Sequence, residues 1–142
     1  MNYTTYNLTT GQILQQISAT DPSNLNFDGV GVIEGIYSGV IYYIDNGTPT
    51  LLPTKPTDGK IYTFNWTTKT WDVDLVQTAI LARQQRNARL TAIDSVNPIW
   101  YASLTADQQQ ELATYRTALL NVPQQTGFPT EIEWPTKPTW LS

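Results

Sequence analysis

Two pairs of carboxylates have the spacing that acid–base chemistry on a strand would need. Asp72 and Asp74 are two residues apart, and so are Glu131 and Glu133. Residues at this spacing share one face of a strand, and glycosidases use two carboxylates about 5 to 9.5 Å apart, one with a raised pKa. Exposed strand carboxylates have no burial or charged neighbour to shift a pKa. We therefore favour a solvated face for both pairs and assign no catalytic residue.

Two residue types that dominate catalytic and metal sites are absent. The 142 residues include no cysteine and no histidine. Disulfides, thiolate metal sites and thiol nucleophiles are thus excluded, as are the commonest general base and metal ligand. We expect a protein that is not an enzyme, with no cofactor and no metal.

Three arginines, Arg83, Arg86 and Arg89, recur at intervals of three. On a helix they would form a partial basic stripe, and phosphate contact is one interpretation. The net charge of −4 provides no basic field for a nucleic-acid backbone. We favour intramolecular pairing with Asp94, Glu111 or a backbone carbonyl of the C-terminal segment, since guanidinium groups suit planar acceptors.

Aromatic residues are concentrated in the first half of the chain. They could form a core, a protein interface or a sugar-stacking surface, and a core is their commonest use in small domains. Adjacent tyrosines on a strand face opposite sides, so at least one of Tyr42 and Tyr43 lies outside the core of a simple sandwich. We predict Tyr43, Trp66 and Trp71 as partner-binding residues. The full set is Tyr3, Tyr6, Tyr37, Tyr42, Tyr43, Tyr62, Trp66 and Trp71.

The helices and strands of the chain determine where these residues lie. Residues 1–74 have the pattern of a β-rich module. A hairpin is predicted around the turn Thr9 to Gly11, and a strand-rich run from residue 30 to 45 closes at Asn46-Gly47. Residues 48–60 contain three prolines and are predicted to be a connector. Residues 60–75 are predicted to form a last hairpin.

Residues 75–122 have helical periodicity. A first helix is predicted over residues 75–94, which contain neither glycine nor proline. After a link over residues 95–103, a second helix is predicted to begin at Thr105, where Gln108 completes a capping box. Leu112, Tyr115, Leu119 and Val122 form its apolar stripe, and Pro123 ends it. Two helices with a short link predict a helical hairpin.

Residues 123–142 are predicted to be an extended tail rich in proline and tryptophan. Prolines preset a polyproline-like segment at low entropic cost. We predict that it packs on the hairpin or on a partner, with Tyr115, Arg116, Phe128, Trp134 and Pro135 forming the dock. The predicted fold class is α+β: an N-terminal antiparallel β-rich module, a two-helix hairpin and an extended proline-rich C-terminal tail.

Residues 83–138 resemble the C-terminal domain of tailed-bacteriophage tail assembly chaperones and tail fibre assembly proteins. The likeness lies in the order of an Arg-Asn helix closing in Asp94, Leu104-Thr105-Ala106, Thr114-Tyr115-Arg116, Gly127-Phe128-Pro129, Trp134-Pro135 and Lys137-Pro138. Family members usually carry tryptophan directly after the aspartate, where this chain has Ser95. This difference affects the details expected for the link between the helices.

The resemblance implies an assembly factor that binds a tail fibre or another tail component, with a trimeric protein expected, and aids its folding, trimerisation or attachment. A permanent virion subunit of the tail fibre, tail tip or baseplate is one alternative, and an adhesin that binds host surface glycan is another. We find neither a signal peptide nor a run of about 20 apolar residues. We therefore expect no membrane partner, and a location in the host cytoplasm during assembly or afterwards in the virion tail.

Overall fold

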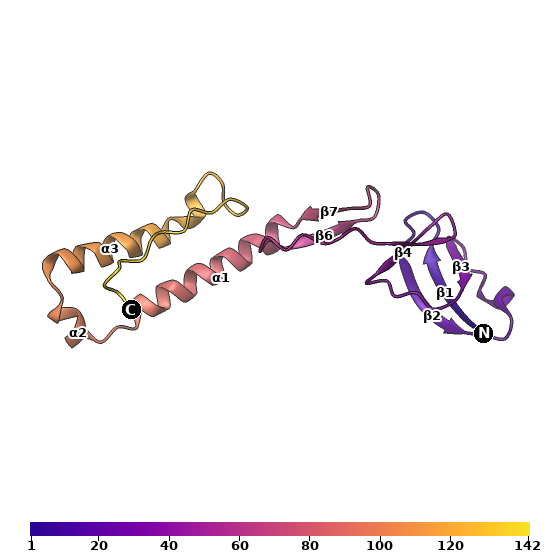
Figure 1. Cartoon of the computed structure of the whole chain (residues 1–142), viewed down its shortest axis with the longest axis horizontal. Coiled ribbons are helices and arrows are strands. Elements are labelled where there is room, and N and C mark those ends of the chain that lie inside the picture. The colour runs from indigo at the N-terminus through magenta and orange to yellow at the C-terminus, as the bar shows by residue number, and fades with distance from the viewer. The chain divides into compact units, whose positions relative to one another are not determined.

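A computed structural model describes residues 1–142 and divides them into two compact units. The β unit comprises residues 1–58 and 62–72, and the helical unit comprises residues 59–61 and 73–142. Antiparallel strands therefore precede the helices in the chain, which confirms the α+β class (Figure 1).

The centre of the β unit is a three-stranded antiparallel sheet in the order β2-β1-β3. Its strands are β1 (Asn2–Asn7), β2 (Ile13–Ser18) and β3 (Val30–Glu34). Four consecutive residues of β1, from Tyr3 to Tyr6, are buried, so the central strand is covered on both faces. The Thr4 hydroxyl donates to the Gly35 carbonyl at 2.9 Å and accepts from the Tyr37 amide at 3.1 Å, which satisfies this buried polar group.

Two further hairpins complete the strands. β4 (Tyr42–Asp45) pairs with β5 (Thr48–Leu51), and β6 (Tyr62–Asn65) pairs with β7 (Thr70–Val73). The turn at Asn46-Gly47 and the last hairpin are confirmed. The prediction that residues 48–60 are entirely a connector was wrong, because β5 forms within them. Pro49 is tolerated there since β5 is an outer strand, where no second neighbour needs its missing N–H.

Two of the turns are built in the same way from a repeated sequence. In Asn7-Leu-Thr-Thr-Gly11 and Asn65-Trp-Thr-Thr-Lys69, the asparagine Oδ1 accepts the backbone amides two and three residues later. The fifth residue then adopts positive φ, 72° at Gly11 and 57° at Lys69. An asparagine side chain that mimics a backbone acceptor favours this turn. A Cβ on Gly11 would lie 2.2 Å from the Ile44 carbonyl oxygen, so glycine is needed at the first turn.

The long helices begin at residues that the sequence marks. α1 spans Leu75–Asp94, the predicted range, and the Asp74 carboxylate accepts the Gln77 amide at its start. α3 spans Ala106–Leu120 and begins with the predicted capping box between Thr105 and Gln108. None of the helices is both long enough and apolar enough to cross a bilayer.

The link between these helices contains a third one, α2 (Pro98–Ser103), which the sequence reasoning missed. The sequence predicts only a link here, with Pro98 inside it. Proline is well tolerated in the first turn of a helix, and Asn97 Oδ1 accepts the Ile99 and Trp100 amides as the cap. Short 3-10 turns, η1 (Pro22–Leu25) and η2 (Val122–Gln124), complete the elements.

The core of the helical unit lies between α1 and α3. We call its five buried residues the apolar cluster: Leu90, Ile93, Leu112, Tyr115 and Leu119. Leu119 is fully buried, as is Val122 just beyond α3. Leu112, Tyr115 and Leu119, three of the four residues predicted for the apolar stripe of the second helix, belong to this cluster, and the fourth, Val122, is buried beyond the end of the helix.

Candidate functional site

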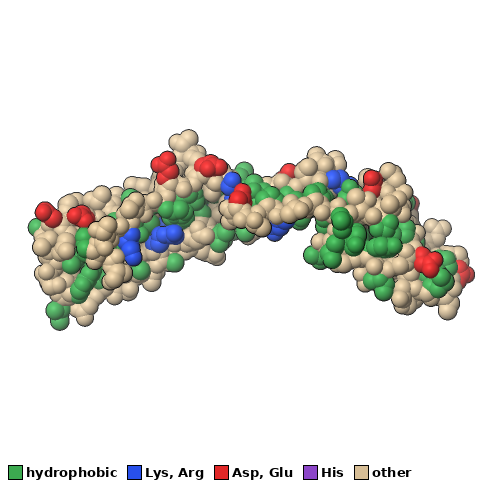
Figure 2. All heavy atoms as spheres, in the orientation of Figure 1, with side chains coloured by type: hydrophobic (Ala, Val, Ile, Leu, Met, Phe, Trp, Pro, Cys, Tyr) green, Lys and Arg blue, Asp and Glu red, His purple; other side chains and the backbone are tan.

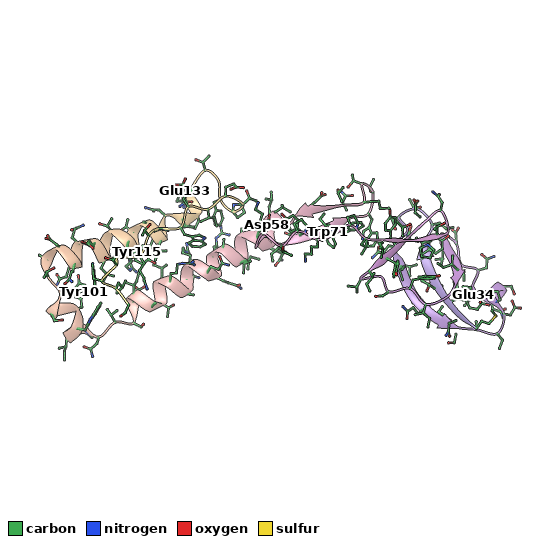
Figure 3. The ribbon with its side chains drawn as sticks, in the orientation of Figure 1. Glu34, Asp58, Trp71, Tyr101, Tyr115 and Glu133 are labelled. Carbon is green, nitrogen blue, oxygen red and sulfur yellow. The ribbon has the colours of Figure 1, made fainter.

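The tail, residues 123–142, lies along the two long helices. Trp134, Trp140 and Leu141 are partly buried against the apolar cluster. Figure 1 shows the yellow C-terminal segment running between α1 and α3, and Figure 3 shows Tyr115 on the side of α3 that faces it. The Gln125 side chain donates to the Glu133 carbonyl at 2.8 Å and accepts the Glu133 amide at 2.9 Å, which anchors the extended backbone. The hairpin and tail thus share one core.

Two arginines of α1 contact aromatic rings of the tail. The Arg89 guanidinium carbon lies 4.1 Å from the Trp134 ring centroid, and that of Arg83 lies 5.1 Å from the Phe128 centroid. Arginine at these distances is attracted to the negative face of an aromatic ring. Arg89 also donates to the carbonyl of Gln85 within its own helix. The arginine stripe therefore faces partly toward the tail.

The expected acidic partners of that stripe are bound by other groups. Asp94 accepts from Arg116, and Glu111 accepts from the Trp140 indole N–H at 2.7 Å. The prediction that the stripe pairs with these carboxylates was wrong. The short helix α2 brings Trp100 to 6.4 Å from Trp140, between ring centroids, so the tail also reaches the turn between the long helices.

Arg116 binds across the two helices. Its Nε donates to Asp94 Oδ1 at 2.8 Å and its Nη2 to Oδ2 at 3.3 Å. The hydrogen bond from Arg116 lowers the pKa of Asp94, and the same bond raises the pKa of Arg116. Both side chains are about half exposed, so the fork contributes orientation of α1 against α3 more than stability.

The predicted dock residues are therefore distributed over three contacts. Tyr115, Trp134 and Pro135 line one groove together. Phe128 lies under Arg83, and Arg116 joins the helices through Asp94. Arg83 and Arg89 were missed as dock residues, although their spacing on α1 already placed them on neighbouring turns.

Two open grooves flank the tail. The groove on the α3 side has a volume of 630 Å³ and is lined by Glu111, Thr114, Pro135 and Pro138 among others. The groove on the α1 side has a volume of 740 Å³ and is lined by Arg89, Ile93 and Trp134 among others. Tyr115, Pro135 and Lys137 contribute to both. The tail thus lies between the two grooves, one on the α3 side and one on the α1 side.

Three of the four paired carboxylates have structural contacts. Asp72 accepts from the Asn65 amide at 2.8 Å, Asp74 caps α1, and Glu131 lies 3.6 Å from the Lys60 amine. No cluster of three or more carboxylates gathers in the structure. These contacts provide no acid–base pair for the glycosidase interpretation.

In the β unit, Phe64 joins two of the predicted partner-binding residues. Its ring makes edge contacts with Trp66 at 4.7 Å and with Trp71 at 5.0 Å, between centroids. The Trp71 indole N–H donates to the Pro53 carbonyl at 2.8 Å. Both tryptophans are partly buried, because they cover the buried Phe64 ring.

Tyr43 is connected to the same region through Lys69. The Lys69 amine lies 5.4 Å from the Tyr43 ring centroid and donates to the carbonyls of Thr10 and Trp66. Tyr43 is partly buried. The structure therefore gathers Tyr43, Trp66 and Trp71 in one region, where they make contacts within the unit.

The most exposed apolar side chains of the β unit are aliphatic, apart from one phenylalanine, and were not among the predicted site residues. Val40 is 86% exposed, and six others exceed half exposure: Leu8, Leu14, Phe27, Ile36, Ile41 and Leu51, with Met1 at the N-terminus. Figure 2 shows hydrophobic side chains gathered over this unit. Strand alternation cannot reveal them, because most lie in turns and loops.

Comparison with known proteins gives one match. Residues 79–139 match the family described as phage tail assembly chaperone protein, which confirms the resemblance seen in residues 83–138. No curated protein and no solved structure matches the chain. The matched region comprises most of α1, then α2, α3 and the tail, so the hairpin with its docked tail is the part of the chain that carries the likeness to this family.

Proposed function

We propose that this chain is a bacteriophage tail assembly chaperone that binds a tail fibre or another tail protein and aids its folding, trimerisation or attachment. The observation that carries the proposal is the match of residues 79–139 to the phage tail assembly chaperone family. That family is described by an assembly role and not by a reaction.

The physical requirements of such a task agree with the chain. A long trimeric fibre of intertwined β-chains has high contact order and exposes strand edges before it closes, so it folds slowly and is prone to aggregate. A partner that binds the unassembled form stabilises it by mass action and needs no nucleotide. We place this action in the host cytoplasm during assembly, after which the chain leaves or stays on the virion tail.

We assign recognition of the tail protein to the β unit. The β unit leaves eight large apolar side chains more than half exposed, whereas the helical unit leaves three, Leu75, Val76 and Ile99. Exposed apolar groups that gather on one unit are typical of protein interaction sites. In this proposal the partly buried Tyr43, Trp66 and Trp71 contribute to the contact together with these exposed apolar side chains and do not form it alone.

Co-expression with the tail fibre gene of the same phage tests the proposal. The soluble trimer is measured by size-exclusion chromatography with light scattering, and purified particles are analysed by gel. Fibre that becomes soluble and trimeric only when this chain is supplied supports the chaperone role. Fibre that folds alone, in particles containing this chain at a fixed ratio, would show a structural subunit instead. Binding of the isolated chain to host surface glycan would favour the adhesin.

A matched pair of variants locates the surface. Val40→Asp places a charge on the β unit at a side chain that is 86% exposed, and Ile99→Asp does the same at 83% exposure on α2. Neither side chain is buried, so both variants are expected to fold. Loss of fibre solubility with Val40→Asp alone supports recognition by the β unit, and loss with Ile99→Asp alone would assign it to the hairpin.

A further inference from the structure

We propose that the outer edge of β3 is a strand-addition site for an extended segment in which Lys or Arg alternates with apolar residues. The inference rests on the proposed function and names the chemistry of the segment that the chain would bind. In strand addition, an extended peptide pairs with the free edge of a sheet, so that main-chain hydrogen bonds provide affinity and side chains provide specificity.

The register of the sheet shows which groups of β3 are free. The Gly35 amide donates to the Asn2 carbonyl and the Leu8 amide donates to the Gly29 carbonyl, so odd-numbered residues of β3 bond to β1. Val30, Val32 and Glu34 therefore point their backbone groups away from β1. The Val30 amide donates to the Phe27 carbonyl at 3.1 Å. The backbone amides and carbonyls of Val32 and Glu34 have no hydrogen-bond partner in the structure.

Two other outer strands, β2 and β5, carry features that protect an edge, whereas β3 carries none of them. Native sheets block their edges with proline, lysine, bulges or covering segments. The β1–β2 ladder contains an irregularity at Thr5/Tyr6, and the Gln16 side chain of β2 donates to the Tyr37 carbonyl. β5 carries Pro49. β3 has no proline, no lysine and no bulge, and its only charged residue is Glu34 at the end.

The charged and apolar side chains around the outer edge of β3 favour a basic and apolar segment as its partner. Exposed carboxylates lie at both ends, Asp28 before β3 and Glu34 at its last position, and Figure 3 marks Glu34. Phe27 and Ile36, 56% and 59% exposed, lie just outside them in the chain. The whole β unit has six carboxylates against two lysines, so it carries the net charge of the chain. A strand with basic and apolar side chains complements this edge, whereas an acidic strand is repelled.

Hydrogen exchange with two defined peptides tests the site on the full chain. The first is a capped heptapeptide of alternating Lys and Val, and the second replaces each Lys by Glu. With the basic peptide at saturation, we expect the Val32 and Glu34 amides to exchange at least about tenfold more slowly, while the Ile33 amide, already bonded to β1, changes little. Unchanged exchange at Val32 and Glu34, or equal slowing by the acidic peptide, would overturn the proposal.

Two variants connect the edge to assembly. Val32→Pro removes the outward N–H, and Val32→Thr is its control because threonine keeps the N–H and suits a strand. Glu34→Lys reverses the charge without touching the backbone and is expected to weaken binding of the basic peptide about two- to fivefold at low salt. Fast exchange of the β1 amides would show that Val32→Pro unfolds the sheet. In that case the affinity of the Glu34→Lys chain for the basic peptide tests the site, and an unchanged affinity would overturn it.

Co-expression then separates this inference from the proposed function. Fibre that the unchanged chain solubilises but the Val32→Pro chain does not supports the edge as the site. Fibre that both chains solubilise equally would refute the edge and leave the chaperone role intact. Fibre that is soluble without either chain would refute the chaperone role, while exchange with the peptides would still report on the edge.

Discussion

Replacing Trp134 with alanine is expected to destabilise the helical unit even though Trp134 lies outside both long helices. The ring packs on the apolar cluster and stacks with Arg89 at 4.1 Å. Removing a fully buried tryptophan costs about 3–5 kcal/mol, so a partly buried one should cost about 2 kcal/mol. The lost contact with the guanidinium adds about 0.5–1 kcal/mol. We expect a total loss of about 2.5–3 kcal/mol in the free energy of opening the helical unit.

Native-state hydrogen exchange measures this loss without assuming that the two units unfold together. The Leu90 and Leu119 amides, in the last third of α1 and near the end of α3, should exchange about 70- to 150-fold faster in the Trp134→Ala chain. Trp66→Ala is the matched control, because that tryptophan belongs to the β unit and should leave these two amides unchanged.

A double-mutant cycle with Arg89→Met then isolates the contact between the guanidinium and the ring. The methionine keeps an apolar stem and removes the charge. The coupling energy between Arg89 and Trp134 should be about 0.5–1 kcal/mol. Exchange of Leu119 at its original rate in the Trp134→Ala chain would refute the reasoning, because the tail would then not be part of the folded core.

Three smaller changes probe other contacts. Gly11→Ala should destabilise the β unit by more than Gly47→Ala, measured by urea unfolding: both glycines have positive φ, which costs an alanine about 1–2 kcal/mol, but only at Gly11 does the Cβ meet the backbone of β4. Asp94→Asn should flatten the acid side of the stability–pH curve of the helical unit. The folded-state pKa of Asp94 is lowered, so its stabilisation is present above the unfolded pKa of about 3.9 and is lost as the pH falls through the folded value; equal slopes for both chains would contradict this. Thr105→Ala removes the cap of α3 and should cost about 1 kcal/mol by exchange of the first-turn amides, while unchanged protection would show that the cap is dispensable.

The sequence predicted best the elements that depend on local chemistry. The range of α1 follows from an uninterrupted run of good helix formers behind Asp74, and the start of α3 follows from Thr105 and Gln108. Asn46-Gly47 marks its hairpin for the same reason, since both residues accept positive φ. In each case the deciding contacts lie within a few residues of one another.

The predictions that failed depended on context that the local sequence does not contain. The sequence predicts Pro98 within the link between the helices and Pro49 within a connector, yet Pro98 is at the first position of a short helix and Pro49 lies in an outer strand. Proline is tolerated at position 49 because its missing N–H lies on the side of β5 that has no neighbouring strand. Asp94 is one of three acceptors expected for the arginines of α1, yet it binds Arg116, because this contact arises only when α1 and α3 pack.

The candidate site was predictable in part. Trp134 and Tyr115 were placed at the tail and the hairpin from their type and position, and the structure puts both at one groove. The open edge of β3 could not be read from the sequence. It follows from the strand order β2-β1-β3, which is set by pairing between residues about thirty apart in the chain.

The position of the tail in the core has a consequence for biosynthesis. Residues 134–141 are translated after both long helices, yet they cover the apolar cluster between them. While these last residues are still inside the ribosome, much of α3 is inside it as well, so α1 emerges with Leu90 and Ile93 uncovered, whereas all strands of the β unit have already emerged. The β unit can thus fold during translation, and the core of the helical unit forms only once α3 and the tail have both left the ribosome. A ribosome stalled before Trp134 would present a nascent chain with a folded β unit and an α1 open to proteases.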